Sequence, residues 1–140
     1  MGKVQILAVL TMDGCLSSEL YDKAHQDLCL DRCGLDEIRK KAFYRVTPDY
    51  SISMLHEWRK DGTNIRYLAE ATPDTSDYIN GLLRMHAVDE IILYTVPFIA
   101  GTGRHFFKSA LPEQHWTLSS LKSYSNGVCR IIYILDQKAR

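Results

Sequence analysis

What the sequence lacks excludes several classes of protein. Its 17 basic residues are balanced by 17 acidic ones, and no block of like charge stands out, so charge favours neither a nucleic-acid partner nor a membrane surface. The opening apolar run after Met1-Gly2-Lys3 is too short to span a membrane and lacks the small-residue cleavage site of a signal peptide. We therefore expect a cytoplasmic protein with no nucleic-acid partner and no membrane partner.

Cysteine is also sparse, and linker-like segments are missing. Four cysteines in a chain with 46% hydrophobic residues indicate reduced, partly buried thiols rather than a disulfide framework. No repeat, low-complexity tract or linker interrupts the 140 residues, a length that suits one domain with its own core. The sequence predicts a single domain over residues 1–140.

The first half of the chain begins with a buried strand. Residues 3–12 are apolar at nearly every position, which is typical of a central strand covered on both faces, and Asp13-Gly14 ends it with a turn. Helical spacing of apolar residues predicts a helix over 18–32. A second short helix is predicted over 35–45 and is broken at 47–49, and residues 50–58 are consistent with either a strand or a helix.

The second half predicts a strand, a helix and another strand. Residues 64–71 form the first strand, residues 72–75 open a helix that extends past residue 80, and residues 89–97 form the next strand. Such a βαβ unit requires two parallel strands that are adjacent or enclose a third. Residues 114–121 and 128–136 alternate as strands around the hairpin signal Ser125-Asn126-Gly127. The fold class is therefore α/β, with a sheet that ends antiparallel.

Several short segments in order resemble one family. They are Ala8-Val9-Leu10-Thr11-Met12-Asp13-Gly14-Cys15-Leu16-Ser17, Val88-Asp89-Glu90-Ile91, Pro97-Phe98-Ile99-Ala100-Gly101-Thr102-Gly103 with Phe106-Phe107, and Asn126-Gly127-Val128 with Tyr133. In this order they resemble the dihydrofolate reductase-like superfamily, and most of all the reductase domain of the bifunctional riboflavin-biosynthesis deaminase-reductase. The resemblance covers the first 17 residues and the chain from about residue 78 onward.

The resemblance implies a fold, an activity and a set of site residues. The fold would be a mixed sheet flanked by helices, and the activity an NADPH-dependent transfer of hydride to a pyrimidine or pteridine-like small molecule at the end of the first strand. By resemblance, Asp13 is the catalytic candidate. The candidates for binding the cofactor are Ala8, Thr11, Gly14, Gly101, Thr102 and Gly103. Asp13-Gly14 is also an ordinary turn that needs no function.

One segment departs from the family pattern. Where the family has a Gly-Gly pair before the crossover helix, this chain has Ala71-Thr72-Pro73-Asp74-Thr75. Proline lacks an amide donor, and the carboxylates of Asp74 and Asp77 disfavour a phosphate at that helix start. This supports a second hypothesis, that the chain is a non-catalytic relative which keeps the fold and binds a ligand or a protein partner.

Two further groups of residues have structural and functional interpretations. His25, Cys29 and Cys33 recur at helical spacing, but no fourth ligand accompanies them, so we expect cysteines packed against the sheet and no metal. Trp116, Tyr124 and Tyr133 on the terminal hairpin are expected in the core or in the contact of a homodimer.

Overall fold

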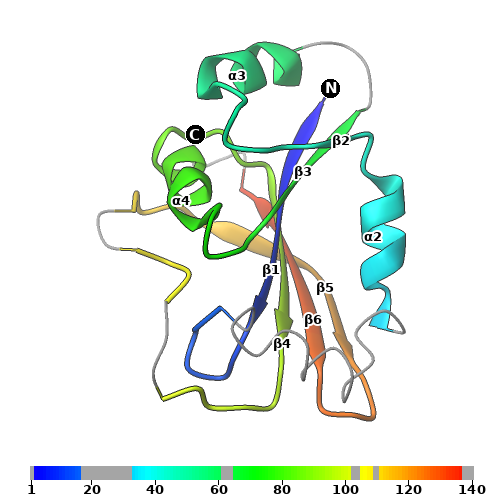
Figure 1. Cartoon of the computed structure of the whole chain (residues 1–140). Helices are drawn as coiled ribbons and strands as arrows, with labels where there is room; N and C mark the ends of the chain where they lie inside the picture. The colour runs from blue at the N-terminus through cyan, green and yellow to red at the C-terminus, as the bar shows by residue number, and fades with distance from the viewer. Residues whose placement is uncertain (1, 17–32, 61–64, 102–104, 109–110, 137–140) are drawn as a thin grey trace.

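The computed structural model describes residues 2–16, 33–60, 65–101, 105–108 and 111–136 (Figure 1). Its strands are β1 (Lys3–Leu10), β2 (Tyr44–Arg45), β3 (Arg66–Glu70), β4 (Glu90–Thr95), β5 (Trp116–Ser123) and β6 (Cys129–Leu135). Its described helices are α2 (Leu35–Lys41), α3 (Ile52–Lys60) and α4 (Ser76–Arg84). The helix predicted over 18–32 lies outside the described residues.

The strand β1 lies in the middle of the sheet, as its apolar sequence predicts. The strand order is β2-β3-β1-β4-β6-β5. Both β3 and β4 pair with β1 in parallel, so that Ile6 lies between Ala69 and Ile91. The predicted βαβ unit is thus confirmed as β3, α4 and β4 enclosing β1, because the crossover helix lets the two strands run in one direction.

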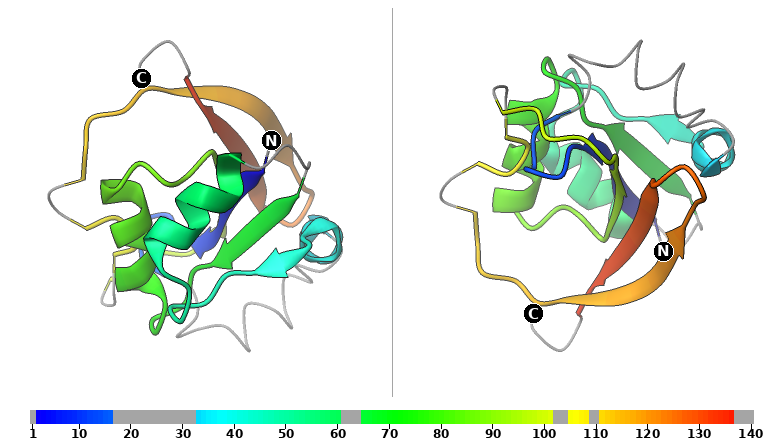
Figure 2. Two further views of the ribbon diagram at one scale, coloured as in Figure 1. Left: turned by 90° about the horizontal axis from the view of Figure 1, so that it is seen from above. Right: turned by 90° about the horizontal axis from the view of Figure 1, so that it is seen from below.

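Apolar side chains fill both faces of the sheet. On one face the core includes Leu55 of α3 and Ile79 and Leu82 of α4, which pack over β1, β3 and β4. On the other face Leu35 of α2 packs with Leu7 and other side chains of the same strands. Figure 2 shows α3 and α4 together on one side and α2 on the other. The alternation of each strand therefore supplies two separate cores.

The segment 35–60 differs from its sequence prediction in part. The predicted helix over 35–45 ends at Lys41, because Tyr44 and Arg45 form the short edge strand β2 beside β3. The Tyr44 ring stacks on Tyr67 with centroids 5.6 Å apart. Helix propensity depends on local sequence, so it cannot reveal this contact between distant residues. The undecided segment is the helix α3, whose start is capped because the Ser51 hydroxyl accepts the Met54 amide at 3.1 Å.

The end of the chain is the predicted antiparallel hairpin. β6 pairs antiparallel with both β4 and β5. Gly127 adopts a φ of 90° in the connecting turn, a conformation that glycine tolerates at little cost. The mixed α/β sheet flanked by helices is therefore confirmed. None of the described helices has the length and apolar character needed to cross a membrane.

Candidate functional site

The loops after β1 and β4 meet at one end of the sheet. The Met12 amide donates to the Phe98 carbonyl at 2.7 Å, and the Phe106 amide donates to the Gly14 carbonyl at 3.2 Å. Because β1 and β4 are parallel neighbours, their carboxyl ends bring residues 11–14 beside residues 96–101 (Figure 1). Two of the segments that carry the family resemblance therefore lie together, although they are more than eighty positions apart.

Asp13 joins these two loops. Its carboxylate accepts hydrogen bonds from the Thr11 hydroxyl, from the Ala100 amide at 3.1 Å and from the Gly101 amide at 3.0 Å. These donors, the Thr11 hydroxyl first, hold the pKa of the Asp13 carboxyl well below its usual range. The carboxylate is consequently ionised at neutral pH and acts as an anchor for the loop after β4. Its role in catalysis stays a prediction.

Thr11 is hydrogen-bonded both to Asp13 and to the next residues of the turn. Its side chain is buried. The Thr11 hydroxyl accepts a hydrogen bond from the Cys15 amide at 3.1 Å and donates one to the Asp13 carboxylate. The Thr11 amide also donates to the Cys15 carbonyl at 2.8 Å. The hydroxyl is therefore used within the protein, which gives Thr11 the geometry of a positioning residue for the turn.

The remaining predicted cofactor contacts have different surroundings. Gly14 and Gly101 adopt φ values of 81° and 74°, which favour glycine. A Cβ added at Gly101 would meet no atom of the described residues within 4 Å, so these residues leave space open beside its backbone. Ala8 is 1% exposed and belongs to the core under α3 and α4. Thr102 and Gly103 lie outside the described residues.

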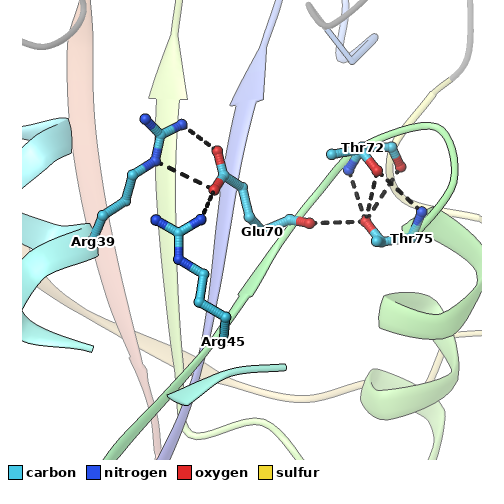
Figure 3. Close-up of polar contacts among 5 residues, drawn as sticks. All are labelled: Arg39, Arg45, Glu70, Thr72 and Thr75. Carbon is cyan, nitrogen blue, oxygen red and sulfur yellow. Dashed lines mark hydrogen bonds and ion pairs between the residues drawn. The ribbon is translucent and has the colours of Figure 1, made fainter. Parts of the chain in front are cut away.

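The loop before α4 uses its own amides. The Thr75 hydroxyl accepts the Thr72 amide at 2.8 Å and donates to the Glu70 carbonyl at 2.8 Å, and the Thr72 hydroxyl accepts the Thr75 amide at 3.2 Å (Figure 3). Pro73 contributes no amide, and Asp74 is exposed. The Glu70 side chain is also engaged, because it pairs with Arg39 and Arg45.

These contacts bear on whether a dinucleotide fits. A diphosphate at a helix start needs backbone amides that point at it, whereas the amides of Thr72 and Thr75 already have partners within the loop. Two of the amides in residues 71–75 are therefore already used, and Pro73 has none to offer to a diphosphate. Gly101, in contrast, lies on an exposed loop where the described residues leave the space beside its backbone open.

A polar cavity beneath α2 was missed by sequence reasoning. Its volume is about 240 Å³, and its lining includes Gln5, Glu37, Arg66, Glu90 and Arg130. At the α2 start, the hydroxyls of Tyr94 and Tyr124 both donate to the Cys33 carbonyl, at 2.8 and 2.7 Å. Burial raises the pKa of Tyr94 to about 12. The strand pattern places Tyr94 on this face, but its partner lies 61 positions away and has no sequence signal.

Cysteines and metal ligands were also considered in the sequence. Cys15, Cys33 and Cys129 are free thiols, as predicted for these three. Within the described ranges, no three His, Cys, Asp or Glu side chains gather in a group that could hold a metal ion. His25 and Cys29 lie outside those ranges, so the metal hypothesis for that helix is not tested.

The strand order, the parallel β3-β1-β4 centre and the antiparallel β4-β6-β5 end are those of the dihydrofolate reductase-like fold. No family model matches the sequence, and no curated protein matches it. Solved structures match over nearly the whole chain.

Three of these structures illustrate the similarity. A protein assigned to riboflavin biosynthesis in Shewanella sp. PV-4 has a TM-score of 0.63 at 11% identity, over 96% of this chain and 99% of that one. A pyrimidine reductase-like protein from Corynebacterium diphtheriae has a TM-score of 0.56 at 12% identity, over 96% and 92%. Dihydrofolate reductase from Enterococcus faecalis, in complex with NADP(H) and RAB-propyl, has a TM-score of 0.57 at 11% identity, over 96% and 97%. At this identity the similarity defines the fold.

Proposed function

We propose that this chain is a cytoplasmic reductase that uses NADPH to transfer hydride to a pyrimidine- or pteridine-like small molecule. The observation that carries the proposal is the paired strand end, where Asp13 fixes the loop after β4 beside the turn after β1. Hydride transfer requires that two flat rings be held in contact, and a rigid edge of small residues can provide this. NADPH would supply the hydride, and the chain would supply the edge.

The neighbours support the same proposal. One of them is a pyrimidine reductase-like protein, and another is a reductase in complex with NADP(H). Both are similar to this chain in fold over 96% of its length. In this chain the described residues leave open space beside Gly101 at the paired strand end. We therefore assign the nicotinamide side of the cofactor to the surroundings of Gly14 and Gly101, with Asp13 as the catalytic candidate.

An equilibrium titration with NADPH tests the proposal. Nicotinamide fluorescence and thermal stabilisation are measured on the whole chain, with NADH alongside. We compare Gly101→Leu with Gly101→Ala, because both substitutions impose the same unfavourable positive φ and differ in the volume placed in the open space. The proposal predicts that NADPH binds and that Gly101→Leu weakens binding roughly tenfold or more, about 1.4 kcal/mol, relative to Gly101→Ala.

Two outcomes would contradict the assignment. If no NADPH binding is detected even at the highest cofactor concentration tested, the reductase hypothesis is wrong. Equal binding by the leucine and alanine variants would remove the assignment of the cofactor to the Gly101 edge. Thermal unfolding without ligand checks that both variants keep the fold.

A second function is favoured by a different observation. In the loop 71–75, the amides of Thr72 and Thr75 bond to hydroxyls of the loop itself and Pro73 has no amide, which disfavours a diphosphate held in the manner that the family resemblance implies. A relative that binds a ligand or a protein partner without catalysis would need no diphosphate site. In that case the same titration would detect no NADPH binding, and the melting temperature of the folded chain would be the same with and without NADPH.

A further inference from the structure

The cavity beneath α2 is lined by polar side chains on a sheet face that is otherwise apolar. Its volume is about 240 Å³, which gives room for a small molecule, since a water in the liquid occupies only about 30 Å³. Leu7 of β1 packs in the apolar core under α2, and Gln5, two positions earlier, faces the same side. Arg66 and Glu90 also face α2, two positions before core residues of β3 and β4. We call this space the α2 cavity.

Gln5 brings an unpaired amide to the α2 cavity. The residue is only 5% exposed, and its side-chain amide makes no hydrogen bond with the described residues. Buried polar groups are normally hydrogen-bonded, because burial costs them their interactions with water. An amide can donate to a ligand oxygen and accept from a ligand hydroxyl. The position of Gln5 is therefore better suited to binding a polar molecule than to packing.

Positive charge gathers at the end of the cavity near the start of β1. Arg66 is aligned with Lys3 in the sheet, and Lys41, the last residue of α2, lines the same cavity. Of the acidic lining residues, Glu90 is paired with Lys3 at 4.0 Å and Glu37 is exposed. Arg66 has no ion-pair partner in the part of the chain that the structure describes. This end therefore attracts an anion.

A second guanidinium lies at the other end of the cavity. Arg130 lines it there, and its Nη1 would lie 3.1 Å from a Cβ built at Gly34, the residue before α2. The Arg130 Nε is buried and has no hydrogen-bond partner within the described ranges, which favours an acceptor that the protein does not supply. Because α2 runs opposite to β1 (Figure 1), Gly34 and Lys41 are separated by the helix length, about 10 Å.

We propose that the α2 cavity binds a small dicarboxylate. One carboxylate lies against Arg66 and Lys41, and the other lies against Arg130. The Gln5 amide donates a hydrogen bond to the ligand between them. A guanidinium binds a carboxylate through two parallel hydrogen bonds, and two linked carboxylates match two cationic ends better than one carboxylate can. The inference does not depend on the proposed cofactor, because Gln5 and Arg66 lie near the strand starts, away from Asp13 and Gly101.

Binding of dicarboxylates to the whole chain without NADPH tests the proposal. Calorimetric titration and thermal stabilisation are measured with succinate, glutarate and adipate. Butyrate and inorganic phosphate are measured in parallel, and sodium chloride keeps the ionic strength equal in all samples. The proposal predicts that at least one dicarboxylate raises the melting temperature and binds roughly tenfold or more tightly than butyrate or phosphate.

Substitutions in the lining locate the ligand. Arg66→Met and Gln5→Leu keep the approximate size of each side chain and remove its hydrogen-bonding groups. Each is expected to weaken dicarboxylate binding roughly tenfold or more. Arg45→Met is the matched control, because Arg45 pairs with Glu70 and lies outside the cavity lining. It should bind the dicarboxylate as the wild type does. Circular dichroism and thermal unfolding without ligand show that each variant keeps the fold.

Three results would overturn the proposal. If none of the dicarboxylates binds at millimolar concentration, the cavity is not a site for this class of ligand. Butyrate or phosphate that binds as tightly as the best dicarboxylate would exclude a ligand held at both ends. Dicarboxylate binding that neither Arg66→Met nor Gln5→Leu weakens would place the ligand elsewhere on the chain.

Discussion

At the scale of single residues, Asp13 has the most defined role. Its carboxylate gathers one hydroxyl and two amides from two loops, and each of these donors favours the ionised form. Asp-Gly in the sequence predicts only a turn. The donors at residues 100 and 101 could not be predicted from local sequence, because they reach Asp13 through the parallel pairing of β1 with β4.

The acid sensitivity of the fold tests this role. Because the folded pKa of Asp13 lies below its ordinary value of 3.8, its contribution to stability is present above about pH 4 and is lost as the pH falls further. The wild type should therefore lose more thermal stability between pH 5 and pH 3 than Asp13→Asn. Melting temperatures across this range measure the effect, with Glu57→Gln on the exposed side of α3 as a control. Parallel curves for wild type and Asp13→Asn would contradict the role.

At the scale of elements, two threonine hydroxyls hold the loop between β3 and α4, and that of Thr75 bonds to both the Thr72 amide and the Glu70 carbonyl. Thr75→Val would remove the acceptor of the Thr72 amide and the donor to the Glu70 carbonyl. We expect a loss of about 1 kcal/mol or more in the free energy of unfolding. Thr75→Ser keeps the hydroxyl and should retain most of that stability. Urea denaturation measures both variants, and equal losses for valine and serine would show that the hydroxyl is not the cause.

The elements also show which parts of the fold the sequence predicts. Strand 3–12 was predicted because burial on both faces leaves a continuous apolar run, and the hairpin strands because burial on one face leaves an alternating pattern. Strands 64–71 and 89–97 were predicted as the two strands of a βαβ unit. The strand β2 was not predicted, since two residues carry no period and Tyr44 depends on Tyr67 across the sheet. The sequence leaves the helix α3 undecided for a similar reason, because its apolar pattern is also compatible with a strand. In the structure, Ser51 caps its start.

At the scale of the whole molecule, the sheet order decides which residues can act together. The order β3-β1-β4 brings the carboxyl ends of β1 and β4 together, and β6 separates β4 from the outer strand β5. The candidate cofactor edge lies at those carboxyl ends, whereas the α2 cavity extends toward the strand starts at Gln5 and Arg66. We expect Arg66→Met to leave any NADPH affinity unchanged, which the fluorescence titration checks.

The candidate site was predictable only where motif and topology agree. Asp13, Gly14 and Gly101 lie at the paired strand end, as the resemblance implies, while Ala8 lies in the core. The α2 cavity with Arg130, and the hydrogen bonds of Tyr94 and Tyr124 to the Cys33 carbonyl, were not predicted, because their partners come from segments far apart in the chain. Such long-range contacts depend on the assembled sheet and leave no spacing in the sequence.

The central claim is that the end of β1 and β4 holds NADPH, and hydrogen exchange measured by mass spectrometry tests it most directly. The account predicts that NADPH slows amide exchange in peptides covering residues 8–14 and 96–101, and leaves residues 116–135 unchanged. Unchanged exchange at the strand end in saturating NADPH would contradict the claim. So would protection confined to another part of the chain.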